Sequence, residues 1–70
     1  MKISARNVLP GTIVSIVRGP VTTEVTLEIA PGVQIVSTIT STSAESLRLK
    51  EGAQAYGVIK ASSVMVATDD

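Results

Sequence analysis

The sequence predicts an all-β domain, and two observations support this fold class. Val, Ile and Thr account for 25 of the 70 residues, and these β-branched side chains favour pleated sheet over helix. Apolar and polar side chains alternate with a period of two along residues 21–29, which is typical of a strand with one buried face. A chain of this length forms one small domain. We expect that domain to span residues 1–70, with Asp69-Asp70 as a solvated tail.

Turn residues divide the chain into short apolar runs, each long enough for one strand. The breaks fall at Pro10-Gly11, Arg18-Gly19-Pro20, Ala30-Pro31-Gly32 and Lys60-Ala61-Ser62-Ser63. An apolar arm at residues 3–9 precedes the first break. The five predicted strands are 11–18, 21–29, 33–40, 53–59 and 64–68.

One short helix is expected between the third and fourth strands. Residues 41–49 contain helix formers and the Thr42-x-x-Glu45 spacing of a capping box, and Gly52 ends the loop that follows. Five strands with a short helix in this place are the order of an OB-like barrel. The sequence therefore predicts an OB-like five-stranded barrel.

A domain this small usually needs stabilisation beyond its own core. The chain has no Cys and no His, so a disulfide is impossible and a structural zinc is disfavoured. Apolar side chains lie on both faces of one predicted strand, at Ile13, Val14, Ile16 and Val17. Either a single domain buries both faces of this strand, or swapped arms and contacts between subunits cover the apolar side chains that one domain would leave exposed. We favour the second interpretation and expect an oligomer.

Charge and composition exclude several classes of partner and activity. Six Lys and Arg balance six Asp and Glu, so nothing favours nucleic acid or an anionic membrane surface. A single Tyr argues against stacking of bases. No apolar run has the length of a membrane-spanning helix or of a signal peptide's apolar stretch, which predicts a soluble cytoplasmic protein. The chain has no His and no Cys, and its predicted helix carries no pair of acidic residues, so we expect no enzymatic activity.

Three places in the chain concentrate hydrogen-bond donors. Ser4 and Arg6 lie two residues apart, on the same side of an extended strand. Thr40 and Ser41 stand where a strand gives way to a helix, a place where backbone N–H groups favour anions. Residues 60–63 combine a lysine with two serines at a second junction. Local caps with a solvated lysine, or a shared anion site, are both compatible with these residues.

Four segments resemble the molbindins, the small Mop-type molybdate- and tungstate-binding proteins with a TOBE-like domain. They are S-A-R-N at 4–7, E-V-x-L-E-I-A-x-G at 24–32, I-T-S-T-S-A-E-S-L-R-L-K-E-G at 39–52 and Y-G-V-I-K-A-S-S-V-M at 56–65. The resemblance extends from Lys2 to about Val66. The chain departs from the family pattern at Val-Leu-Pro 8–10 and at Arg18-Gly19-Pro20.

The resemblance implies an OB-like barrel in a homo-hexamer, a trimer of dimers, with oxyanions held between subunits. Ser4 and Arg6 would come from one chain, and a neighbouring chain would supply Thr40, Lys60, Ala61 and Ser62. A possible second oxyanion site would use Gly19, Val21 and Thr22. The ligand would be molybdate or tungstate held by hydrogen bonds, with no direct metal ligand from the protein and no organic cofactor.

The donor set also predicts selectivity among anions. Molybdate and tungstate are fully deprotonated at neutral pH, so their oxygens only accept hydrogen bonds. The proton of hydrogenphosphate would need an acceptor, and an unpaired buried polar group costs about 1–3 kcal/mol. Sulfate would be excluded by its smaller size alone. The predicted function is storage or homeostasis of molybdate or tungstate, and the alternative is a structural or interaction module of the same fold without a ligand.

Overall fold

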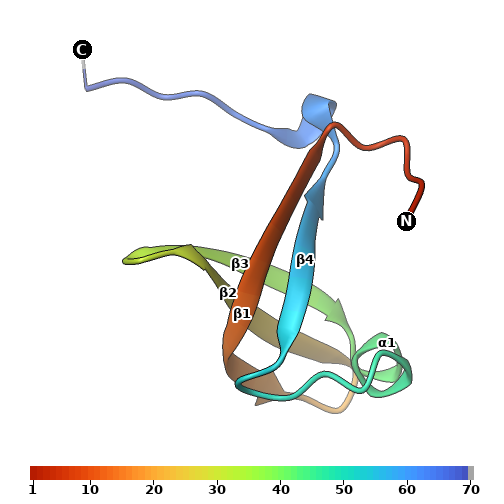
Figure 1. The fold of residues 1–70 in the computed structure, drawn as a ribbon. Helices are drawn as coiled ribbons and strands as arrows, with labels where there is room; N and C mark the ends of the chain where they lie inside the picture. Colours follow the sequence, from red (N-terminus) through yellow and green to blue (C-terminus); the bar gives the residue numbers. More distant parts are fainter. Residues whose placement is uncertain (70) are drawn as a thin grey trace.

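The computed structural model describes residues 1–69 of the chain. Within these residues the elements are β1 (Asn7–Arg18), β2 (Thr22–Ala30), β3 (Val33–Thr40), α1 (Ser41–Ser46), β4 (Gln54–Ile59) and the 3₁₀-helix η1 (Ala61–Ser63). The strands form one antiparallel sheet in the order β3-β2-β1-β4. The sheet curls, so that the long β1–β4 ribbon crosses over the β2–β3 hairpin (Figure 1). The all-β class with one short helix after the third strand is confirmed.

The expected break at Pro10-Gly11 is wrong, because β1 runs through both residues. The first half of β1 pairs with β4, and pairing with β2 begins only at Thr12, which lies opposite Glu28. Pro10 therefore stands where one side of β1 has no partner strand in the sheet, so its missing N–H costs no ladder hydrogen bond. A Cβ at Gly11 would lie 2.8 Å from the Glu28 carbonyl oxygen, so only glycine fits where β1 crosses from one partner to the other.

The fifth predicted strand, at residues 64–68, is not a strand in this chain. It follows η1 as an extended, exposed segment, and Figure 1 shows it running away from the sheet. The described residues thus contain four strands, and the sheet is a half-barrel. Of the predicted solvated tail, Asp69 is exposed and Asp70 lies outside the described residues.

The hairpin and the helix follow from local sequence. The turn after β2 is made at Pro31-Gly32, where Gly32 has φ of 76°, a conformation that glycine adopts without a steric penalty. Helix α1 begins where expected, but its N-cap is Thr40 rather than Thr42. The Thr40 side chain accepts a hydrogen bond from the Ser43 backbone N–H, which satisfies one of the helix's unpaired donors.

The core lies on the concave side of the curl. Its fully buried apolar residues are Ile13, Val25, Leu27 and Ala44, and Thr23 is buried with them at 1% exposure. The predicted inward face of β2 is therefore confirmed at Thr23, Val25 and Leu27. In contrast, Val14 and Val17 on β1 are exposed, as expected for a strand with apolar side chains on both faces. No helix within residues 1–69 combines the length and apolar composition needed to span a membrane.

Candidate functional site

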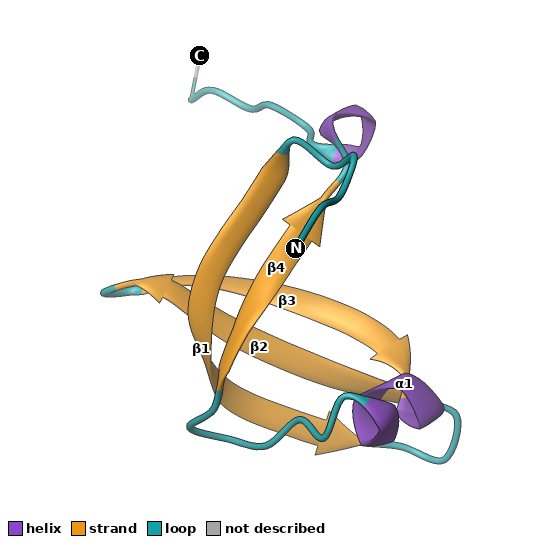
Figure 2. Ribbon diagram, turned by 45° about the vertical axis from the view of Figure 1, so that its right-hand side comes forward, coloured by secondary structure: helices purple, strands orange, loops and turns teal. Residues whose placement is uncertain are grey.

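Five of the six residues predicted for the main oxyanion site lie at one end of the β1–β4 ribbon. Asn7 pairs with Ile59 as the outermost pair of the ladder, so Arg6 and Lys60 are the next residues outward on two neighbouring strands. Figure 2 shows the segment before β1 beside η1 at this end. We name this group the ribbon end; it consists of Ser4, Arg6, Lys60, Ala61 and Ser62.

The ribbon end is held together by one side chain and by a tight turn. The Asn7 Nδ2 donates to the Ile59 carbonyl oxygen at 3.1 Å and so fastens the two strand ends. In η1, the Ser63 N–H donates to the Lys60 carbonyl oxygen at 2.9 Å. The first N–H groups of a helix have no acceptor inside it, so those of Ala61 and Ser62 can turn outward. The side chains of all five ribbon-end residues are exposed.

The sixth residue, Thr40, lies at the opposite end of the sheet, beside the residues predicted for a second site. Thr22 and Thr40 pair in the β2–β3 ladder, and the Ser41 N–H donates to the Val21 carbonyl oxygen at 2.8 Å. Figure 1 places α1 and this corner far from the chain termini and η1. We name the corner formed by residues 19–23 and 40–43 the helix end; it contains the predicted site residues Gly19, Val21, Thr22 and Thr40.

Polar groups at the helix end are engaged within the chain. The Ser41 hydroxyl donates to the Gly19 carbonyl oxygen at 2.7 Å and lies 2.8 Å from the buried Thr23 Oγ1. The Gly19 N–H donates to the Thr22 carbonyl oxygen at 3.0 Å. An anion at the predicted second site would therefore need donors other than the Gly19 N–H.

The helix end also contains a residue that sequence reasoning missed. The Thr40 hydroxyl accepts from the Ser43 N–H at 3.1 Å and donates to the Ser43 Oγ at 2.7 Å. Ser43 is exposed, and its own hydroxyl proton can be donated outward while its oxygen accepts from Thr40. The signal was the three-residue spacing from Thr40 to Ser43, which is the reach of an N-cap side chain.

The single chain therefore does not assemble the predicted site by itself. The resemblance groups Lys60, Ala61 and Ser62 with Thr40, whereas within one chain they lie beside Arg6 at the ribbon end. A site that uses both groups needs the ribbon end of one chain and the helix end of another.

The chemistry of the ribbon end suits an anion that only accepts hydrogen bonds. It combines a guanidinium, an ammonium, two serine hydroxyls and backbone N–H groups, and charge-assisted hydrogen bonds of this kind are the strong ones. Residues 1–69 contain no cluster of His, Cys, Asp or Glu that could hold a metal ion. The group fits an oxyanion held by hydrogen bonds.

Comparison with known protein families shows which family this chain belongs to. The family model of the TOBE domain matches residues 3–66. The chain belongs to the TOBE domain family. Within that family it is 50% identical to molybdenum-pterin-binding protein 2 of Clostridium pasteurianum over 66 residues, which are 94% of this chain and 97% of the relative. The resemblance to the Mop-type proteins inferred from four sequence segments is thereby confirmed.

Some TOBE relatives are longer than this chain. The chain is 49% identical over 69 residues to the molybdenum transport protein ModE of Herbaspirillum seropedicae, which is 99% of this chain but about a quarter (26%) of that protein's length. Among solved structures, a molybdate-binding protein from Sporomusa ovata superposes with a TM-score of 0.90 at 34% identity, covering 97% of this chain and all of that one. The cytoplasmic molybdate-binding protein ModG, with molybdate bound, gives a TM-score of 0.82 at 41% identity over 87% of this chain and 43% of its own.

Proposed function

We propose that this chain binds molybdate or tungstate as a tetrahedral dianion and that it serves storage or homeostasis of that oxyanion. The observation that carries the proposal is the ribbon end, where Arg6 and Lys60 extend from neighbouring strand ends beside two serine hydroxyls. No carboxylate belongs to this group. A binding rather than a catalytic role agrees with it, because the group contains neither a general base nor an activated nucleophile.

The relatives support the choice of ligand. The solved structures with the same fold include proteins described as molybdate-binding, one of them with molybdate bound and described as cytoplasmic. We extend to this chain both the ligand and a location in the cytoplasm.

The proposed site is shared between chains. Arg6, Lys60 and their neighbours would hold the anion from one side, and Thr40 with Ser43 would close it from the helix end of another chain. Such sharing requires an oligomer, and we propose a hexamer built as a trimer of dimers. The exposed apolar residues Ile3, Val17 and Val21 supply surface for these contacts.

Selectivity would arise from the donor set rather than from charge alone. Molybdate and tungstate match a group of donors, hydrogenphosphate leaves its proton without an acceptor, and sulfate is too small to reach all donors within about 3.2 Å. The site should therefore bind molybdate and tungstate with similar affinity and reject the two common cellular anions.

Isothermal titration tests the ligand. Molybdate and tungstate should each give a saturable isotherm, and sulfate or phosphate at the same concentration should give none. A chain that binds none of the four anions would instead be a structural or interaction module of the same fold.

Light scattering tests the assembly. At micromolar concentration the mass should be several times 7.2 kDa, with six copies expected. A monomer at that concentration would rule out any site shared between chains.

A further inference from the structure

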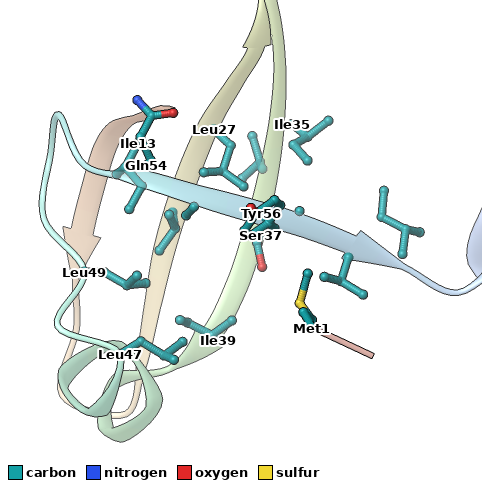
Figure 3. Close-up of a pocket in the computed structure, with 16 residues that line it drawn as sticks. Met1, Ile13, Leu27, Ile35, Ser37, Ile39, Leu47, Leu49, Gln54 and Tyr56 are labelled. Carbon is teal, nitrogen blue, oxygen red and sulfur yellow. The ribbon is translucent and has the colours of Figure 1, made fainter. Parts of the chain in front are cut away.

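The sheet is hollowed at two places. The concave side holds an apolar cavity of about 520 Å³, and Figure 3 shows the Gln54 side chain at its rim with the amide group directed away from Leu47 and Leu49. A second hollow of about 280 Å³ lies where β1, the tip of the β2–β3 hairpin and the start of β4 meet. We name it the hairpin groove; it is lined by Pro10, Gly11, Thr12, Glu28, Ile29, Ala30, Pro31 and Gln54.

Strand register brings the polar side chains of the hairpin groove into one row. Thr12 lies opposite Gln54 on β4 and opposite Glu28 on β2, and directly opposed residues of antiparallel strands point to the same face. The neighbouring pair, Ile13 with Leu27, is buried in the core. Because successive strand residues alternate between faces, the row lies on the face of the sheet that is turned away from the core.

The row presents hydrogen-bond acceptors to the groove. The Gln54 Nε2 donates to the Thr12 Oγ1 at 2.9 Å, which leaves the Gln54 amide oxygen to accept from a ligand. The carboxylate of Glu28, which is half-buried, adds two further acceptor oxygens. No lysine or arginine of residues 1–69 is among the lining residues, so the charge of this carboxylate is available to a cation from outside the groove.

The rest of the groove is apolar. Pro10 and Pro31 form part of its walls together with Ile29, and Pro10 lies before the point at which β1 begins to pair with β2. A carboxylate beside apolar walls suits an amphipathic cation, whose alkyl stem packs against carbon while its charged head reaches an acceptor. The same carboxylate would repel an oxyanion.

We propose that the hairpin groove binds an alkylguanidinium group. Glu28 accepts two parallel N–H bonds from the guanidinium, the Gln54 amide oxygen accepts a third, and the alkyl stem lies against Pro10 and Pro31. A guanidinium fits this row better than an ammonium does, because its donors form a rigid planar fork. Thr12 and Gln54 lie at the other end of the β1–β4 ladder from Asn7 and the ribbon end, so the proposal does not depend on which anion the chain binds.

Titration with butylguanidinium, followed by the amide signals of the whole chain in nuclear magnetic resonance spectra, tests the site. At millimolar concentration the signals of Gly11, Thr12, Ile29 and Ala30 should shift and saturate with one common Kd. Butylammonium, which has the same stem and charge, should bind more weakly. Shifts that rise without saturation would overturn the proposal, and so would equal affinities for the two cations.

Two glutamates of β2 provide a matched pair of variants. Glu28→Gln should raise the Kd for butylguanidinium roughly tenfold, because it removes a charge-assisted, bidentate acceptor. Glu24→Gln removes the same charge at an exposed position on the same face of β2, outside the groove, and should keep the parent's Kd. Equal affinities in the two variants would mean that Glu28 does not hold the cation.

Gln54→Glu covers the case in which Glu28→Gln folds poorly. It places a second carboxylate in the row and should lower the Kd for butylguanidinium roughly two- to fivefold, the size of an exposed ion pair. An unchanged or higher Kd would contradict the site.

The source of the guanidinium is tested with a capped amino acid. If N-acetylarginine methylamide shifts the same signals as butylguanidinium, the groove accepts an arginine side chain of a polypeptide. If only butylguanidinium shifts them, the groove accepts a free small guanidinium compound. Neither compound shifting these signals in the parent would overturn the proposal.

Discussion

The two ends of the curled sheet use the same kinds of residue in different ways. At the helix end, hydroxyls and backbone groups bond to one another: Thr23 with Ser41, Ser41 with Gly19, and Thr40 with Ser43. At the ribbon end, Asn7 fastens the two strands, while Arg6 and Lys60 extend into solvent. Buried polar groups must be paired within the fold, whereas exposed donors are available to a ligand.

We therefore expect the two ends of the sheet to have different roles. The interior of the helix end stabilises the corner between β2, β3 and α1, and only its exposed surface at Thr40 and Ser43 remains for a partner. The ribbon end supplies the charge. Substitutions at the two ends should therefore separate stability from oxyanion affinity.

The largest expected effect is at Arg6. Arg6→Ala should weaken molybdate binding by about 2–5 kcal/mol, as does the loss of one member of a buried charge pair. Arg6→Lys should recover only part of this, because an ammonium lacks the fork of a guanidinium. Titration calorimetry measures both variants. Parent-like affinity in Arg6→Ala would mean that the anion binds away from the ribbon end.

A second effect is the gain in stability from the ligand. At a molybdate concentration one hundred times Kd, mass action adds about 2.7 kcal/mol per independent site, and the chains that form a shared site divide this gain. Thermal unfolding should shift upward by several degrees with molybdate or tungstate and little with sulfate. Lys60→Ala should reduce the shift. If millimolar molybdate does not change the melting temperature, the result would favour a structural module that binds no ligand.

At the helix end, Thr23→Val should act on stability. It removes a hydroxyl at a residue that is 1% exposed and leaves the Ser41 hydroxyl with Gly19 as its partner, so we expect a loss of about 0.5–1.5 kcal/mol. Urea unfolding measures the loss, and calorimetry should find molybdate affinity unchanged. A tenfold loss of affinity with unaltered stability would remove the distinction between the two ends.

The last effect, of a size similar to that of Thr23→Val, is at Asn7. Asn7→Leu keeps the approximate size of the side chain and adds no charge, but removes the amide donor to the Ile59 carbonyl. Affinity for molybdate should fall by about 0.5–1.5 kcal/mol as the spacing of Arg6 and Lys60 loosens, and Asn7→Gln, which keeps an amide donor, should lose less. Equal affinities in the parent and Asn7→Leu would show that this clamp does not position the site.

Local patterns predicted most of the fold because local physics determines those parts. Alternation along residues 21–29 identified the buried face of β2, and Pro31-Gly32 identified the hairpin turn. The strand break expected at Pro10 failed for a non-local reason: proline is tolerated there because β2 does not pair with that half of β1. The fifth strand at 64–68 failed as well, because after η1 this segment runs away from the sheet and pairs with no strand among the described residues.

For the candidate site, the sequence proposes residue types but not their arrangement. Spacing points to Ser4 with Arg6 and to the donors of residues 60–63, and their role in binding stays a prediction. That these two groups meet depends on the register of β1 with β4, in which Asn7 lies opposite Ile59, and no local pattern encodes that register. For the same reason, local patterns did not predict that Thr40 lies at the opposite end of the sheet from the other residues.

The central claim is that the ribbon end of one chain and the helix end of another share each oxyanion, and mixed oligomers test it most directly. Arg6→Ala disables the ribbon end. Thr40→Asp disables the helix end by repelling the anion, while Asp still caps α1, and Thr42→Asp is its control. Neither variant alone should bind molybdate at the parent's affinity.

Refolded together in equal amounts, the two variants should regain about a quarter of the parent's binding sites, each built from one intact ribbon end and one intact helix end. Titration calorimetry counts those sites. A mixture that regains none, from chains that demonstrably co-assemble, would contradict the shared site.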